Sequence, residues 1–373
     1  MDLSNIFCHN LDCPARGQTG QGNITVHSQK EGRCQCNVCG TTFSTKKGTI
    51  FYRLKTAPAT VILVLTLLAY GCPIKAIVVA FGFDERTVKN WWERAGNHSQ
   101  AVHKHVVGQS QLDLEQAQAD ELKGKIQGRS IWMAMAIMVS TRLWLGGVVS
   151  ERRDKHLLNR LAEQIRNMAL CRPLLLAVDG LPGYVNAFQQ AFRTKQPREG
   201  QPGRCRWHSW PDIAIVQVIK RRAENKLSIE RRIVQGGKEL VERLLSRSQG
   251  GGTINTAYIE RLNGTFRQRL NSLARRTRTL AAQPETLQAG MYVIGCIYNF
   301  CTYHQSLRVP YHLSEHSQRW LQRTPAIAAG LTDHCWTVEE LFSFKVPPPR
   351  WSPPKKRGRS SKETLALIER WCQ

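Results

Sequence analysis

The sequence predicts a multidomain protein in which a cysteine-rich module and a small all-α segment precede an α/β core, a mixed sheet flanked by helices. Three observations predict this order. Five of the twelve cysteines come before residue 40. Three short helical stretches follow between residues 56 and 106, and a strand-like alternation begins near residue 113. A chain of 373 residues is long enough for two or three domains with a substantial buried core.

The charge of the chain indicates a polyanionic partner. Lys and Arg number 53 against 28 Asp and Glu, which gives a net charge of +25. In a soluble protein this excess favours a surface that binds nucleic acid. A charge that serves solubility, or a ribosome-associated protein, is the alternative.

The N-terminus and the cysteines favour a reducing, cytoplasmic compartment. Met1 leads into polar residues and a cysteine pair rather than into a basic and then apolar leader. The apolar stretch from Val61 to Tyr70 is well short of the about 20 residues that a membrane span needs, so it predicts a buried helix and no membrane partner. In a reducing cell the clustered cysteines indicate metal ligands rather than disulfides.

Residues 1 to 50 are too polar to hold a core unaided, and their cysteines predict a zinc-ribbon-like module. Cys36 and Cys39, followed by Gly40, have the spacing of a zinc knuckle. Cys8 and Cys13 are the natural second pair, although four residues separate them and His9 or Cys34 could replace one ligand. A closed site with four ligands would bind structural Zn²⁺ and carry no catalysis. The alternative is a flexible arm with unligated cysteines.

Residues 56 to 106 have the outline of a helix-turn-helix. The second helix is expected to start near Pro73 and the third at Asp84, which can cap it. Val88, Trp91 and Ala95 fall on one face and should pack inward. The opposite face carries side chains suited to DNA bases and phosphates: Arg86, Lys89, Asn90 and Arg94. A solvated helix of any small bundle would show the same pattern.

The remaining sequence predicts alternating strands and helices. Strands are expected at 118–126, 131–139, 142–149, 174–178 and 213–219, with an exposed strand pair around Asn225. Helices are expected at 154–168, 257–275 and 287–303. The segment 193–206 is predicted to be a loop, and the Pro-rich tail 346–362 to be disordered until it meets DNA.

Three acids are candidates for a catalytic metal site. Asp120 lies on the first core strand, Asp179 ends a buried strand, and Glu260 lies in a helix. An acid beside apolar strand residues costs several kcal/mol unless it is paired or binds a metal. Converging carboxylates would suit Mg²⁺ or Mn²⁺. Each acid alone has a simpler explanation, since Asp before Gly is common in turns and a helical Glu is usually solvated.

The helix that holds Glu260 continues with side chains suited to DNA phosphates. They are Arg261, Asn263 and Arg267.

Together these residues resemble the DDE transposases of bacterial insertion sequences, and the chain is similar to the insertion-sequence-one type. The resemblance covers most of the sequence and rests on the following segments: Cys-x-x-Cys-Gly-x-x-Phe at 36–43, the helix-turn-helix, Ala-Asp-Glu at 119–121, Ala-Val-Asp-Gly at 177–180 and Asn-Thr-Ala-Tyr-Ile-Glu-Arg-Leu-Asn at 255–263. Tyr298-Asn299-Phe300, His304 and Ser306-Leu307-Arg308 resemble the segment that closes the catalytic core in this superfamily.

The resemblance implies an RNase H-like catalytic domain over residues 112–310, with two Mg²⁺ ions held by Asp120, Asp179 and Glu260. It implies DNA cleavage at the ends of a mobile element and transfer of the 3′-hydroxyl to target DNA. The expected partners are double-stranded DNA and further copies of the chain, and the expected location is the bacterial nucleoid.

Two features depart from the family pattern. The stretch between Asp179 and Glu260 is long, so 193–252 could hold an insertion, and Glu121 could share the role of Asp120. The last segment, 311–373, reads as a C-terminal extension whose basic run 355–359 resembles a minor-groove hook, or else is a solvated tail. Two other functions stay open: a catalytically silent DNA-binding regulator derived from a transposase, and an RNase H-like nuclease that cuts without joining.

Overall fold

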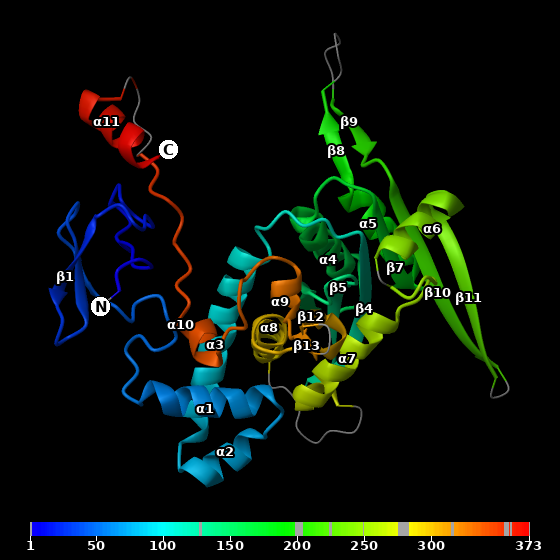
Figure 1. Ribbon diagram of the computed structural model, residues 1–373, viewed down its shortest axis with the longest axis horizontal. Helices are drawn as coiled ribbons and strands as arrows, with labels where there is room; N and C mark the ends of the chain where they lie inside the picture. The colour runs from blue at the N-terminus through cyan, green and yellow to red at the C-terminus, as the bar shows by residue number, and fades with distance from the viewer. Residues whose placement is uncertain are drawn as a thin grey trace. The chain divides into compact units, whose positions relative to one another are not determined.

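A computed structural model describes residues 2–126, 129–197, 204–223, 226–248, 250–274, 283–314, 317–353, 358 and 360–372. The chain forms two compact units (Figure 1). The first unit joins the two ends of the chain, Met1–Ala59 with Phe342–Gln373, and the second is Thr60–Leu341.

The first unit contains a small antiparallel sheet that is ordered β1-β2-β3. Its strands are β1 (Ile24–Ser28), β2 (Arg33–Cys36) and β3 (Thr42–Ser44). The C-terminal helix α11 (Lys362–Trp371), which the sequence analysis did not predict, belongs to this unit. Trp371 of α11 is buried in one core cluster with Ile6, Ile24 and Phe43. The Gln18 side chain donates a hydrogen bond of 3.1 Å to the Trp371 carbonyl.

The prediction that the tail 346–362 is disordered is wrong at Pro348, which packs against the N-terminal part of the chain. Pro348 approaches Gly17 so closely that a Cβ on Gly17 would lie 2.7 Å from the Pro348 carbonyl oxygen. Four of the five residues of the basic run, 355–357 and 359, lie outside the described residues.

The second unit starts with three helices, as predicted. They are α1 (Pro58–Ala69), α2 (Ile74–Phe81) and α3 (Glu85–Val106). The third, at 22 residues, fills the predicted stretch from Asp84 to residue 106. Asp84 caps it by accepting hydrogen bonds from the backbone N–H groups of Arg86 and Thr87, and Val88, Trp91 and Ala95 are buried as predicted.

The apolar stretch of α1 is buried on one side. Val61, Val64 and Leu65 are fully buried, whereas Leu63 and Tyr70 are about half exposed. Among the described residues, no helix combines the length and apolar character needed to cross a membrane.

A mixed sheet of six strands forms the centre of the second unit, with the order β11-β10-β7-β4-β5-β6. β4 (Gln116–Ile126), β5 (Arg129–Met138) and β6 (Trp144–Ser150) form an antiparallel meander. β7 (Leu174–Asp179) and β10 (Ile213–Ala223) continue the sheet in parallel with β4, and β11 (Lys226–Gln235) closes it in antiparallel orientation. The predicted α/β core with a mixed sheet is confirmed.

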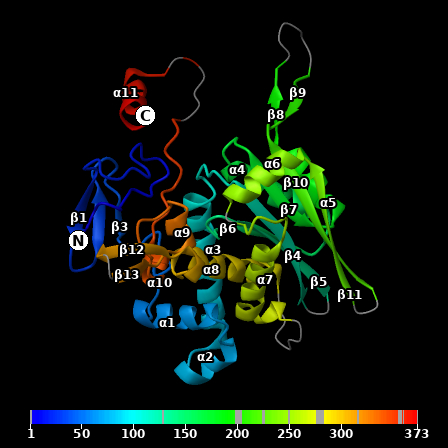
Figure 2. The same ribbon diagram turned by 45° about the vertical axis from the view of Figure 1, so that its right-hand side comes forward.

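Helices flank this sheet (Figures 1 and 2). They are α4 (Lys155–Met168), α5 (Pro182–Ala191), α6 (Lys238–Arg247), α7 (Ala257–Arg269) and α8 (Pro284–Phe300). Asp120 of β4 contacts α7, and the next residue, Glu121, contacts α5. Because successive strand residues point to opposite faces, α5 and α7 cover opposite faces of the sheet.

Several elements between Asp179 and Glu260 differ from the prediction. α5 and α6 were not predicted, and the expected loop at 193–206 contains the hairpin β8 (Arg193–Gln196) and β9 (Arg206–Ser209). The strand pair around Asn225 is confirmed by the pairing of β10 with β11. The stretch 193–252, considered as an insertion, thus supplies two strands of the central sheet.

The described residues after α8 form smaller elements. They are the hairpin β12 (Val309–Ser314) and β13 (Ser317–Leu321), followed by α9 (Pro325–Ala328) and α10 (Val338–Ser343).

Candidate functional site

The first unit brings four of its cysteines together. The sulfur atoms of Cys8, Cys13, Cys36 and Cys39 all lie within 4.8 Å of one another. The Sγ atoms of Cys8 and Cys39 are 3.6 Å apart, and those of Cys13 and Cys36 are 3.8 Å apart. Tetrahedral Zn²⁺ with bonds of about 2.3 Å would place its sulfur ligands about 3.8 Å apart. This cluster can therefore hold a metal such as zinc.

Local structure explains why these four residues meet. The Gly40 N–H bonds back to the Cys36 carbonyl at 2.8 Å, and Gly40 adopts φ +69°. This turn suits glycine and folds Cys39 back beside Cys36. The two alternative ligands lie elsewhere: Cys34 is buried outside the cluster, and the His9 ring packs against Phe43 at 5.5 Å.

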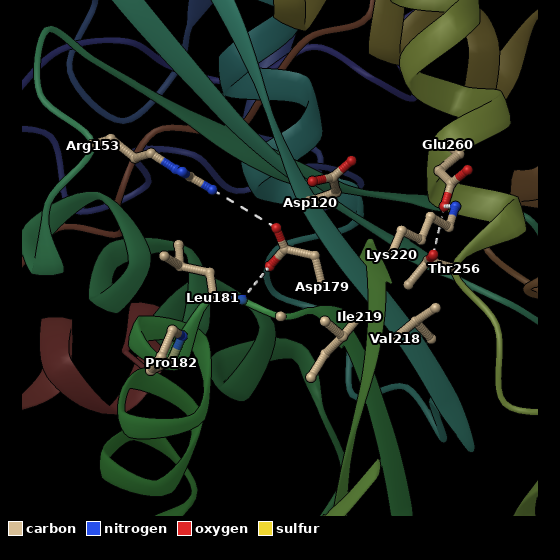
Figure 3. A pocket seen from close by; sticks show the side chains of 11 residues that line it. Asp120, Arg153, Asp179, Leu181, Pro182, Val218, Ile219, Lys220, Thr256 and Glu260 are labelled. Carbon is tan, nitrogen blue, oxygen red and sulfur yellow. Dashed lines mark hydrogen bonds and ion pairs between the residues drawn. The ribbon is translucent and has the colours of Figure 1, made fainter. Parts of the chain in front are cut away.

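The second unit brings the three candidate acids to one open pocket of about 540 Å³ (Figure 3). β4 and β7 are parallel, with Ala119 paired to Val178. Asp120 and Asp179 therefore follow at the same level on neighbouring strands, where side chains point to the same face. Glu260 reaches the pocket from the first turn of α7. Arg153, Lys220 and Thr256 also line it.

Asp120 is the most perturbed of these acids. Its Oδ1 accepts a hydrogen bond from the Glu121 N–H at 2.8 Å, and its Oδ2 accepts one from the Asn263 amide at 2.7 Å. Burial, together with the nearby carboxylates of Glu121, Asp179 and Glu260, raises the pKa of Asp120 to about 7. A buried carboxyl among other acids keeps its charge at neutral pH when a cation binds there.

Asp179 has both a structural contact and an open side. Its Oδ1 accepts a hydrogen bond of 3.0 Å from the Leu181 N–H, which shapes the turn into α5. Its Oδ2 lies 3.7 Å from Arg153. The simple role expected of an Asp before Gly is thus present, and the same carboxylate also faces the pocket.

The Glu260 carboxylate has two partners among the described residues, one of them a positive charge. The Lys220 ammonium and the Thr256 hydroxyl both donate to its Oε1. Lys220 comes from β10 and was not among the predicted site residues. Val218 of β10 pairs with Asp179, and Lys220 comes two residues later in the same strand. Alternate residues of a strand share a face, so this spacing places Lys220 on the face of the sheet that carries Asp179.

A fourth acid, Glu121, lies closer to Asp120 and Asp179 than Glu260 does. Asp120, Glu121 and Asp179 have carboxylate oxygens within 4.8 Å of one another and could hold a metal. The Glu121 side chain is only 2% exposed, pairs with Arg153, and accepts a hydrogen bond of 2.8 Å from the Tyr184 hydroxyl. Both of its oxygens are therefore engaged on the α5 side of the sheet.

Two side chains from the sheet fix α7, and the sequence analysis assigned neither to this role. Gln118 is fully buried. Its Oε1 accepts hydrogen bonds of 3.0 Å from the N–H groups of Tyr258 and Ile259, and its Nε2 donates to the Asn255 carbonyl at 2.8 Å. One turn further along α7, Asn263 bonds to Asp120.

The prediction that Asn263 contacts DNA is therefore wrong. It is 2% exposed, and its amide holds the Asp120 carboxylate. The other predicted DNA contacts differ in exposure. Arg86, Lys89, Asn90 and Arg261 are exposed, with Lys89 paired to Glu85 at 2.7 Å, whereas Arg94 and Arg267 are half-buried.

Comparison with known proteins gives no further guide to this site. No protein-family model matches the chain, and no curated protein matches its sequence significantly.

Proposed function

We propose that this protein is a DDE-type transposase, which binds the ends of a mobile DNA element and carries out metal-dependent cleavage and strand transfer. One observation carries the proposal: Asp120 and Asp179 lie side by side on parallel strands, and Glu260 lines the same pocket from α7. Carboxylates from three separate elements in one open pocket offer the oxygen ligands that metal-assisted phosphoryl transfer uses.

The proposal includes an RNase H-like assignment for the α/β core. Support comes from the three-stranded meander β4-β5-β6 and the parallel strands β7 and β10 that extend it. This order puts the first two acids at the centre of the sheet. The last acid then arrives on α7, which packs on β4 and β5. Since one fold hosts many functions, the acids and not the fold carry the functional argument.

The donor set fits a hard divalent cation. Asp120, Asp179 and Glu260 offer oxygen ligands in an open pocket, as Mg²⁺ and Mn²⁺ prefer. Two such ions, when bound, would activate the attacking oxygen and stabilise the leaving oxygen of an in-line displacement. The metal-ligand role falls less readily to Glu121, because Arg153 and Tyr184 already engage its two oxygens.

The chain's own residues would prepare this site. Asn263 orients Asp120 through its amide hydrogen bond, and Gln118 fixes the start of α7 that presents Glu260. Lys220 neutralises Glu260, and its ammonium group lies where a DNA phosphate entering the pocket would need a positive partner. Arg153 adds a second positive charge beside Asp179.

DNA binding is proposed for α1–α3 as a helix-turn-helix with α3 in the major groove. On α3, Arg86, Lys89 and Asn90 are exposed.

A second basic surface, on the β8–β9 hairpin, supports the same partner. In the β8–β9 hairpin, Arg193 and Lys195 lie 4.4 and 5.0 Å from the ring centre of exposed Trp207. The described residues of this hairpin include no acid, and a two-stranded ribbon fits the major groove.

The experiment places the gene with its native flanking DNA on a plasmid and measures insertion into a second plasmid. We expect insertion with the wild type and none with Glu260→Gln, which keeps the side-chain size but removes the charge. Purified Glu260→Gln should still bind the DNA ends. Glu242→Gln, a surface glutamate on α6, is the matched control and should keep full activity.

The outcomes separate the functions. Wild-type insertion frequency in Glu260→Gln would remove this acid from the site. Mn²⁺-dependent cutting by the wild type without insertion would identify a nuclease. Binding of the ends without cutting would identify a DNA-binding regulator.

A further inference from the structure

A second pocket opens beside α7 next to the acidic one. It has a volume of about 360 Å³, and Tyr258 and Arg261 line it from the helix. The other walls come from Arg142, Gly250, Gly251, Asn255, Ala257 and Ser306. A smaller adjoining hollow shares Arg142, Tyr258, Arg261 and Ser306, and adds Tyr298 and His304. No carboxylate lines either one.

The positive charge of this pocket is not neutralised by the described chain. Within the ranges that the structure describes, neither Arg142 nor Arg261 forms an ion pair with a carboxylate. Arg142 lies over the Tyr258 ring, with its Cζ 4.0 Å from the ring centre. Its Nη1 is buried and has no hydrogen-bond partner among the described residues. A guanidinium group that packs on an aromatic ring, is partly desolvated and has no acid beside it is set to receive an anion.

The backbone at Arg142 supports a role in binding. Arg142 sits in the turn between β5 and β6 with φ +59°. This left-handed conformation is uncommon for residues other than glycine, and it concentrates at sites where ligands are held. Burial keeps the pKa of His304, another wall residue, at about 4, so its ring is neutral. The charge of the pocket therefore comes from the two arginines.

We propose that this pocket binds a backbone phosphate of the DNA strand whose neighbouring phosphodiester enters the acidic pocket. The inference rests on the proposed function, because it takes DNA as the substrate. Two guanidinium groups with the Ser306 hydroxyl match the oxygens of a phosphodiester. Arg261 directly follows Glu260 in α7, so a phosphate held here would fix the strand close to the proposed metal site. The pocket thus positions the substrate and takes no part in bond making.

The test measures DNA binding by the full chain without relying on catalysis. A fluorescein-labelled duplex is titrated by anisotropy at several NaCl concentrations, and the logarithm of the association constant is plotted against that of the salt concentration. Each neutralised phosphate contributes about −0.9 to this slope. We expect the double variant Arg142→Gly, Arg261→Gln to have a slope that is less negative by about 1 than that of the wild type. Glycine is chosen at residue 142 because it suits a positive φ.

The matched control is Arg172→Gln, an exposed arginine paired with Asp113, which should keep the wild-type slope. A folded double variant with the wild-type slope would overturn the proposal. Should the double variant fail to fold, Arg261→Gln alone, at an exposed helix position, gives the same test. If the wild type and the double variant differ in slope as expected but the wild type never cuts DNA, the proposed function is contradicted and the pocket assignment stands.

A second arm distinguishes DNA from free phosphate. The melting temperature of the wild type and of the double variant is compared in inorganic phosphate and in chloride at equal ionic strength. Phosphate protection that needs both arginines, together with an unchanged DNA slope, would identify a site for small anions and overturn the assignment to DNA.

Discussion

At the scale of single residues, Gln118 shows how a buried polar side chain can organise a site without touching a substrate. It accepts from two N–H groups at the start of α7 and donates to the chain just before that helix. These N–H groups are among those that a helix cannot satisfy internally. Because Gln118 and Asp120 project from the same face of β4, strand and helix are joined at two successive turns.

We expect Gln118→Met to destabilise the second unit by about 1–3 kcal/mol, since buried donors of α7 lose their acceptor. Glu260 would then be held less firmly, so Mn²⁺ affinity should also fall. Urea unfolding and calorimetric Mn²⁺ titration measure the two effects. Gln118→Glu keeps the acceptor and is the comparison: it should retain more stability than Gln118→Met. Equal stability of the two variants would show that these hydrogen bonds do not hold the helix.

His103 provides a pH-dependent prediction that is independent of both metal sites. Its ring is buried in α3 against Trp144 and Tyr292, with ring centres 4.6 and 5.6 Å away. Burial lowers the pKa of His103 to about 4, whereas an unfolded histidine has a pKa of about 6.5. Between these values the unfolded chain binds a proton that the folded chain excludes, so this contribution to stability is complete above pH 6.5 and falls as the pH drops toward 4.

We therefore expect the wild type to lose about 2 kcal/mol more than His103→Phe between pH 7.5 and pH 5. Urea unfolding of both proteins at the two pH values gives the difference. Other histidines titrate in both proteins and cancel in this comparison. Parallel loss of stability in the two proteins would mean that His103 is protonated without cost in the folded chain.

At the scale of elements, the sequence predicted those whose side chains repeat with a clear period. The capped face of α3 and the alternating strands β4, β5 and β6 were recognised because local burial follows the backbone period. α5 and α6 were missed, and so was the β8–β9 hairpin, whose polar residues carry no apolar period. Asn263 was misread for a related reason: an amide looks equally suited to DNA and to a buried carboxylate until its partner, 143 residues away, is known.

The candidate site could be predicted only where the local sequence marks a residue. Asp120, Asp179 and Glu260 were identified from their sequence settings, and they do line one pocket. Lys220, Arg153 and Gln118 could not be identified, because their roles depend on which strands become neighbours in the sheet.

The cysteine module makes a prediction at the same scale. We expect Cys36→Ser to lose bound zinc and to unfold the small sheet of the first unit, because a structural metal contributes its binding energy to folding. Cys34→Ser is the control: this buried cysteine, two residues away on β2, lies outside the four-sulfur cluster and should keep the zinc content of the wild type. Metal analysis of the purified proteins decides the matter, and zinc loss in Cys34→Ser but not in Cys36→Ser would reassign the ligand.

At the scale of the whole molecule, the two ends of the chain fold together, which no local pattern could predict. The tail looked disordered because its own residues offer no core. Helix α11, which follows that tail, completes the core of the N-terminal module, where Trp371 is 6% exposed and Leu367 packs beside it. A small metal module gains more from one added aromatic side chain than a large domain would, because little other apolar surface is buried in it.

Because α11 packs in the core of the cysteine module, we expect this helix to help the module retain its metal. Truncating a buried tryptophan costs about 3–5 kcal/mol, so Trp371→Ala should release zinc at a lower chelator concentration than the wild type and should expose the tail to protease. Leu365→Ala is the control on the same helix, since Leu365 is 46% exposed and should leave zinc retention unchanged. Zinc release is followed with a colorimetric chelator, and cleavage of the tail by mass spectrometry. If Trp371→Ala holds zinc as firmly as Leu365→Ala does, the module folds without the tail, and the contact between the two ends adds nothing to metal binding.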